Sequence, residues 1–126
     1  MRVTVIKTML MAQDMERAVA FYRTVFGFNP KFTSEHWSEL SWKDAVVALH
    51  GEHDGSQNRS CLSIEVDDIV TAAEAVAQNG GKMLVAPLRR EGEPIIYSEF
   101  MDAEGNIVML TQFLGEDEIA AADLLA

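Results

Sequence analysis

The chain contains one helix pattern twice, and this repeat constrains the fold more than any other feature of the sequence. Apolar residues recur with the spacing of a single buried helix face from Met15 to Phe26. Asp14 precedes this segment as a typical helix cap, and Gly27 follows it as a typical helix stop. The same pattern returns 54 positions later, where Asp68 matches Asp14 and Gly81 matches Gly27. The sequence therefore predicts two equivalent units.

β-like segments lie on both sides of each predicted helix. One precedes each helix, at 3–12 and at 60–66, and the two match under the same offset. Three shorter segments, separated by turn residues, follow each helix; they span 29–34, 37–42 and 45–50 in the first half and 82–88, 95–101 and 107–112 in the second. Each half is therefore predicted to be a β-α-β-β-β unit.

A sheet that is covered by a helix on one face leaves its other face unburied. We therefore expect an α+β fold in which two tandem modules form curved mixed sheets around a shared cleft, with the helices on the outside. With 126 residues the chain supports one core, so a single domain over 1–126 is expected. Its modules are predicted at about 3–50 and 60–113, joined by a polar linker at 51–59 and followed by an acidic helical tail at 116–126.

The charge and the cysteine content exclude several classes of protein. The net charge of −10 would repel nucleic-acid phosphates and anionic lipids, so neither kind of partner is expected. Cys61 is the single cysteine and cannot form an internal disulfide. Lys7 interrupts the first apolar segment, which lacks a signal-peptide pattern, and no apolar run approaches the ~20 residues that span a bilayer. A cytoplasmic protein is expected.

The paired modules, the segment MERAVAFYRTVFGF at 15–28 and the turn DAEGN at 102–106 resemble the vicinal oxygen chelate superfamily. This superfamily includes glyoxalase I, extradiol dioxygenases, and the bleomycin- and fosfomycin-resistance proteins. The resemblance extends from Val3 to about Phe113 and implies the fold of two β-α-β-β-β modules. It does not imply one reaction, because the fold hosts several chemistries. Ala103 stands where the family's turn usually has a proline.

In glyoxalase-like members of this family, four inward-facing side chains bind a divalent metal ion. The resemblance places Lys7, Ala48, Cys61 and Met109 at these four positions. Alanine has no ligand atom, lysine is cationic near neutral pH, and a thioether is a poor ligand for hard ions. Only the cysteine could bind a metal, so we expect no metal or other cofactor, and no metal-dependent catalysis at these positions.

Strand alternation predicts the other side chains that face the cleft. The complete predicted set is Lys7, Met9, Met11, Ala48, His50, Cys61, Ser63, Glu65 and Met109, with Trp37 and Trp42 from the middle strands. Methionines with a few polar groups are typical of an adaptable small-molecule pocket, although methionines also fill ordinary cores. Lys7 and Glu65 fit either a charged ligand or a structural ion pair. The tryptophans could stack on a planar ligand, pack at a sheet edge or form a dimer contact.

We favour a small-molecule-binding protein that needs no metal, with a sequestration or resistance role like that of the antibiotic-binding members. The negative charge favours a cationic ligand, and the tryptophans favour an aromatic one. One alternative is a glyoxalase- or dioxygenase-like lyase, isomerase or oxygenase with an atypical metal or acid/base site that uses some of His50, Cys61, Glu65 and Glu99. No catalytic residue is assigned.

The second alternative is a structural or regulatory dimer without a small ligand. A homodimer is expected in either case, because short sheets leave exposed edges. The resemblance has the same implication, since modules from two chains often complete the cleft in this family.

Overall fold

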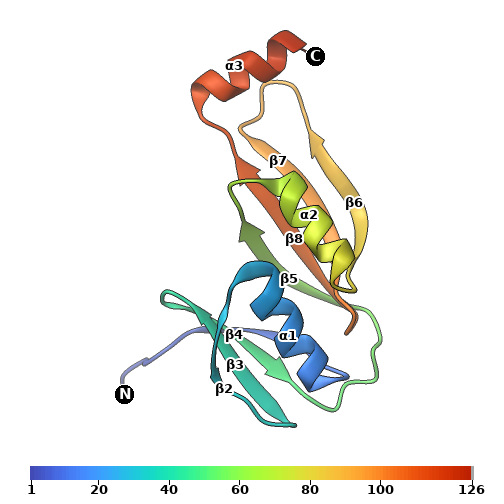
Figure 1. Ribbon diagram of the computed structural model, residues 1–126. Coiled ribbons are helices and arrows are strands. Elements are labelled where there is room, and N and C mark those ends of the chain that lie inside the picture. Colours follow the sequence, from blue (N-terminus) through green and yellow to red (C-terminus); the bar gives the residue numbers. More distant parts are fainter. Residues whose placement is uncertain (126) are drawn as a thin grey trace.

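The computed structural model describes residues 1–125 and contains two modules (Figure 1). The first module comprises β1 (Lys7–Met11), α1 (Met15–Phe26), β2 (Asn29–Phe32), β3 (Trp37–Trp42) and β4 (Ala45–His50). The second comprises β5 (Asn58–Glu65), α2 (Ile69–Gln78), β6 (Lys82–Arg89), β7 (Ile95–Met101) and β8 (Asn106–Phe113). The predicted α+β class and the two tandem β-α-β-β-β modules are confirmed.

Each module forms a mixed four-stranded sheet with the same strand order, β1-β4-β3-β2 in the first and β5-β8-β7-β6 in the second. The first and last strands of each module pair in parallel, and the other neighbours pair antiparallel. The parallel pairs of the two modules differ in one place, because β5 has an irregularity between Arg59 and Ser63 that β1 lacks. Cys61 lies within it and has a φ of 62°. The second module therefore departs from the repeat at this cysteine.

Both helices begin at the residues that the repeat predicts. The Asp14 side chain accepts a hydrogen bond from the backbone N–H of Arg17 at 3.1 Å, and the Asp68 side chain accepts one from that of Thr71 at 3.1 Å. These bonds satisfy N–H groups that have no partner inside the helix. α1 ends at Gly27, whose left-handed φ of 70° suits a residue without a Cβ atom.

One hydrophobic core lies between the helices and the sheets and is shared by both modules. Its buried members are Leu10, Ala12, Ala18, Phe21, Tyr22, Phe28, Leu40, Val47, Leu49, Ile69, Val76, Phe100, Val108 and Leu110. The rings of Phe21 in α1 and Phe100 in β7 lie 5.9 Å apart between centroids, and α1 is a neighbour of α2. The two helices therefore cover the same side of the two sheets (Figure 1).

The turn between β7 and β8 connects the second module to the first through buried polar groups. The carboxylate of Asp102 accepts hydrogen bonds from the Tyr22 hydroxyl at 2.6 Å and from the Asn106 side chain at 2.9 Å. The Asn106 side chain also accepts a bond from the Met11 amide at 2.9 Å and donates one to the Met11 carbonyl at 2.7 Å. β1 and α1 are thus fixed to the start of β8.

Glu104, in the same turn, makes a second connection. Its side chain is 2% exposed and accepts a bond from Arg17 Nε at 2.7 Å. It also accepts the backbone N–H groups of Gln13 at 3.0 Å and Asp14 at 2.8 Å. The hydrogen bond to Glu104 raises the pKa of Arg17. The turn that carries the family resemblance therefore also sets the relative placement of the modules.

The remaining segments lie outside the paired sheets. Residues 51–57 connect β4 to β5, and α3 (Glu116–Leu125) follows β8 at the far end of the second module (Figure 1). Asp123 of α3 contacts Arg89 of β6, with Oδ1 and Nη1 2.8 Å apart. The last residue of the predicted tail, 126, lies outside the described residues. None of the helices described for residues 1–125 has the length and apolar character needed to cross a membrane.

Candidate functional site

The sheet faces that no helix covers form one side of the molecule, which we call the open side. Strand registers define its residues on the first sheet: Met9 of β1 and Glu39 of β3 both pair with Ala48 of β4. On the second sheet, Ser63 of β5 and Glu99 of β7 both pair with Met109 of β8. Residues of the opposite parity, among them Leu10, Leu49, Val108 and Leu110, lie in the core beneath the helices.

Three side chains form a first cluster on this side: Lys7, Trp37 and Glu39. Lys7 Nζ lies 2.7 Å from Glu39 Oε2, and Trp37 Nε1 donates to the same oxygen at 2.8 Å. Both bonds favour the ionised carboxyl, so they lower the pKa of Glu39, with the bond from Lys7 as the larger cause. Glu39 is therefore an ionised acceptor over an extended pH range.

Three side chains form a second cluster: Arg59, Tyr97 and Glu99. The Tyr97 hydroxyl donates to Glu99 Oε2 at 2.6 Å, and Arg59 Nη1 lies 3.5 Å from Glu99 Oε1. The hydrogen bond to Glu99 raises the pKa of Tyr97, so the phenol remains a donor near neutral pH. Each cluster thus combines a carboxylate, an aromatic donor and a basic side chain.

The two clusters occupy equivalent positions in the two modules. Glu39 pairs with Ala48, and Glu99 pairs with Met109 in the same antiparallel arrangement. The basic residues also correspond, because Lys7 pairs with Val46 and Arg59 pairs with Ile107. The internal repeat therefore extends from the fold to the polar groups of the open side.

Sequence reasoning missed Glu39, Tyr97 and Arg59 as site residues. A signal for the first two was present, because WSEL at 37–40 and YSEF at 97–100 share the order aromatic, serine, glutamate, apolar. Arg59 had no such signal. The constant offset of 54 matches Lys7 with Cys61. Because of the irregularity in β5, the residue that actually corresponds to Lys7 lies two positions earlier, at Arg59. A strand bulge of this kind leaves no clear trace in the hydrophobic pattern.

Most of the predicted cleft residues lie on the open side. The registers place Lys7, Met9, Met11, Trp37, Ala48 and His50 there on the first sheet, and Ser63, Glu65 and Met109 on the second. Lys7 was predicted to face a charged ligand or to form an ion pair with Glu65. In the structure Lys7 pairs with Glu39, and Glu65 is exposed. Contact with a ligand stays a prediction for all of these residues.

Two predicted residues lie elsewhere. Trp42 has the parity of Leu40, which faces the core, so it does not share the face of Trp37. It lies at the end of the β3–β4 hairpin, 50% exposed, with Lys43 Nζ 4.5 Å from its ring centroid. Cys61 is exposed within the irregular part of β5 and outside the paired register. The prediction that Trp42 and Cys61 both face the cleft is corrected accordingly.

His50 and Cys61 are both candidates for an acid/base site, which would require a hydrogen bond between the imidazole and the thiol. The Nδ1 of His50 lies 2.8 Å from the Gly51 carbonyl oxygen, and its ring packs edge-on against Trp37 with 6.0 Å between centroids. No hydrogen bond joins His50 to Cys61 among residues 1–125, and the two residues belong to different sheets. The arrangement does not activate the thiol as a nucleophile, which would need a base within hydrogen-bond reach.

The residues at the family's metal positions do not fit a divalent ion. Lys7 is held by the Glu39 carboxylate, and Ala48 is fully buried and has no donor atom. Met109 offers only a thioether, and Cys61 lies in the irregular strand segment. Within the described part of the chain, no three His, Cys, Asp or Glu side chains converge on a possible metal position.

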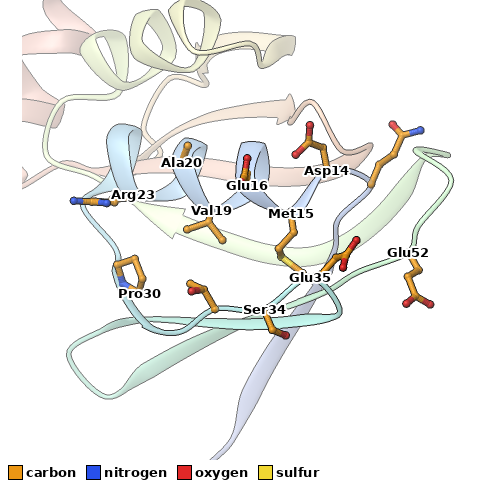
Figure 2. A pocket seen from close by; sticks show the side chains of 12 residues that line it. Asp14, Met15, Glu16, Val19, Ala20, Arg23, Pro30, Ser34, Glu35 and Glu52 are labelled. Atoms are coloured by element: carbon orange, nitrogen blue, oxygen red, sulfur yellow. The ribbon is translucent and has the colours of Figure 1, made fainter.

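The structure also has a groove on the helix side, between α1 and the segment after β2, with a volume of about 1030 Å³. In Figure 2, Met15 and Val19 point into it from α1, and Pro30 and Ser34 lie opposite them. None of the predicted cleft residues lines this groove. It is therefore separate from the open side and does not bear on the predicted cleft.

A second hollow of about 430 Å³ lies between the β3–β4 hairpin and β5. It is lined by Trp42, Ser63 and Glu65 together with core residues from both modules. These three predicted residues do come together, at the junction of the modules.

Comparison with known proteins identifies the family. The sequence model of the Glyoxalase/Bleomycin resistance protein/Dioxygenase superfamily matches residues 4–110. The chain belongs to this superfamily. The vicinal oxygen chelate resemblance seen in the sequence is thereby confirmed. No curated protein matches the sequence.

Solved structures of the superfamily share the fold. The fosfomycin resistance protein FosX from Mesorhizobium loti is 21% identical, with 100% of each chain covered and a TM-score of 0.69. FosX from Listeria monocytogenes is 11% identical, with 94% of this chain and 99% of that chain covered and a TM-score of 0.73. A family enzyme from Burkholderia phytofirmans PsJN is 18% identical, with 84% and 95% covered and a TM-score of 0.70. At such identities these likenesses show the fold alone.

Proposed function

We propose that this superfamily member binds a small organic molecule on its open side and that binding needs no metal ion. One observation carries the proposal. The family's metal positions hold Lys7, Ala48, Cys61 and Met109, none of which is His or Glu. Carboxylates lie beside two of them instead, because Glu39 pairs with Ala48 and Glu99 pairs with Met109. Such placed polar groups on a largely apolar surface are typical of small-molecule sites.

The surroundings of the clusters support a cationic or aromatic ligand. Met9 and Met109 are 49% and 40% exposed, and they provide polarizable surface that adapts to the shape of a ligand. Trp37 and Tyr97 are partly buried and offer aromatic surface beside each carboxylate. The net charge of −10 attracts cations at long range. A sequestration or resistance role is part of the proposal; resistance is the role that the names of the two FosX structures state.

A homodimer completes the proposal. Both helices cover one side of the sheets, so the open faces of both sheets lie on the other side of the chain (Figure 1). Apolar side chains are exposed there: Phe113 is 59% exposed, and Ile95, its register partner, is 40% exposed. Exposed apolar patches mark interaction surfaces, and a second chain is the simplest cover. A cytoplasmic location stays a prediction, consistent with a single cysteine that forms no internal disulfide.

A thermal-shift screen on chelator-treated protein tests this function. We expect organic cations or aromatic compounds in a broad library to stabilise the protein, since a ligand at ~100 times its dissociation constant adds about 2.7 kcal/mol. Met109→Ala should reduce the shift, because it removes polarizable surface, and Val70→Ala, which shortens an exposed residue of α2, should preserve it.

Two outcomes would contradict the proposal. Stabilisation that needs added metal would favour the enzyme alternative. A library without any stabiliser would favour a structural dimer without a small ligand.

A further inference from the structure

We propose that Glu39 and Glu99 select a cationic ligand, and that Lys7 and Arg59 occupy the places of its cationic groups until the ligand displaces them. This inference rests on the proposed small-molecule function and names the chemical class of the ligand: an organic cation with N–H donors on a flat apolar body. It makes the two basic side chains internal competitors of the ligand.

Both carboxylates have acceptor capacity to spare. Glu39 receives its two side-chain bonds on Oε2, and no hydrogen bond to its Oε1 is present among residues 1–125. Glu99 receives the Tyr97 bond on Oε2, while its Oε1 has only the 3.5 Å contact from Arg59. A carboxylate offers about four lone-pair positions. Each one can therefore accept an N–H group from a ligand.

The carboxylates are recessed and their basic partners are peripheral. The side chains of Glu39 and Glu99 are 23% and 15% exposed, whereas those of Lys7 and Arg59 are 36% and 68% exposed. Ion pairs with a solvent-exposed partner are weak and change an equilibrium constant only about two- to five-fold. A ligand can therefore replace Lys7 and Arg59. The aromatic donors would keep the carboxylates in position during this exchange.

The exchange of one cation for another keeps the charge balance of each cluster. A carboxylate that lost its basic partner without a replacement would remain ionised and uncompensated in a partly desolvated place, which is costly. An anionic ligand would instead have to approach Lys7 within reach of Glu39, against the net charge of −10. Trp37 and Tyr97 add aromatic faces that attract cations. The geometry therefore favours an amidinium or an aromatic ammonium.

Three probes of equal size separate the charge classes: benzamidine as the cation, benzamide as the neutral compound and benzoate as the anion. Titrations of ¹⁵N-labelled, chelator-treated protein at millimolar probe concentrations measure each affinity. We expect benzamidine to bind and to shift the Trp37 indole N–H signal. Benzamide and benzoate should bind at least about tenfold more weakly, because hydrogen bonds between charged groups are the stronger ones.

Variants then test the two roles. Glu39→Gln and Glu99→Gln should each weaken benzamidine binding about tenfold or more. Glu74→Gln, the same charge change on the exposed side of α2, should have no effect. Lys7→Met should strengthen benzamidine binding about two- to five-fold, because it removes the competitor. Lys43→Met, at the β3–β4 turn, should leave it unchanged. Circular dichroism verifies that each variant is folded.

The inference is overturned if benzoate binds more tightly than benzamidine, if Lys7→Met weakens benzamidine binding, or if benzamidine does not bind at all. If benzoate or benzamide binds metal-free protein as tightly as benzamidine or more tightly, the proposed small-molecule function stands while this inference fails. Absence of binding by every probe and by the whole screening library would overturn both.

Discussion

Glu39 and Glu99 occupy equivalent positions on the open side of the two sheets, one in each module. Each accepts a hydrogen bond from an aromatic side chain two residues earlier, Trp37 at 2.8 Å and Tyr97 at 2.6 Å. Each also pairs in register with a position where, by family resemblance, metal-binding relatives keep a ligand. The chain thus has a carboxylate beside both sites, although Ala48 and Met109 themselves offer no hard donor atom.

The Tyr22 hydroxyl is expected to stabilise the contact between the modules. Tyr22→Phe removes the 2.6 Å bond to buried Asp102 and should lower the free energy of unfolding by about 1–3 kcal/mol. Tyr97→Phe is the matched control, since it removes a bond of equal length to the part-buried Glu99. It should cost less than about 1 kcal/mol. Urea unfolding measures the unfolding free energy of both variants. Equal decreases would show that burial does not increase the contribution of the Tyr22 hydrogen bond.

The Asp102 carboxyl should make stability depend on pH in a defined direction. Burial raises its pKa, against the opposing hydrogen bonds from Tyr22 and Asn106. The native state therefore holds this proton to a higher pH than the unfolded state, so stability falls as pH rises from about 3.9 through the raised pKa. The difference in unfolding free energy between wild type and Asp102→Asn should therefore decrease as the pH rises through this range. Unfolding curves at several pH values measure the difference, and an advantage that grows with pH would contradict the raised pKa.

Gly105 is expected to tolerate no side chain. It has a φ of +97°, and an added Cβ atom would collide with the carbonyl oxygens of Ser56 and Gly55. Gly105→Ala should therefore cost at least about 2 kcal/mol of unfolding free energy, from strain together with steric overlap. Gly92→Ala provides the control, because its φ is +81° and no atom lies within 4 Å of the added Cβ. Similar losses in thermal unfolding of the two variants would show that backbone strain alone accounts for the effect.

The repeat in the sequence predicted the fold because it depends on local patterns. Asp14 and Asp68 as helix caps and the alternation that directs Leu10 and Leu110 into the core are short-range properties that survive in the structure. The polar clusters depend on register instead. An irregular segment at Cys61 adds two residues to β5, so Arg59 is the counterpart of Lys7 in place of Cys61, while Ser63 keeps the register that the repeat predicts.

The face of Trp42 could have been predicted from the sequence, because alternation in the predicted strand 37–42 gives it the parity of Leu40 and not that of Trp37. Whether the open faces of one chain meet or lie side by side could not be predicted in this way. That arrangement depends on long-range bonds such as Tyr22 to Asp102, between residues that are distant in sequence.

Mixed dimers test whether two chains share each site. If cluster residues from one chain complete the site with those of its partner, Glu39→Gln and Glu99→Gln homodimers should each bind benzamidine weakly. An equal mixture after subunit exchange should regain about one quarter of the wild-type sites, because half of the dimers are mixed and each contains one intact site. Calorimetric titration counts the sites. No recovery on mixing would place each site within a single chain.

The central claim is that the open side binds its ligand without a metal ion. It is tested most directly by measuring metal content and ligand affinity on the same protein, purified without chelator and then treated with one. We predict nickel, zinc and manganese far below one ion per chain, and a dissociation constant that chelation does not change. A stoichiometric metal bound at micromolar affinity or better, or ligand binding that is lost on chelation and restored by metal, would contradict the account.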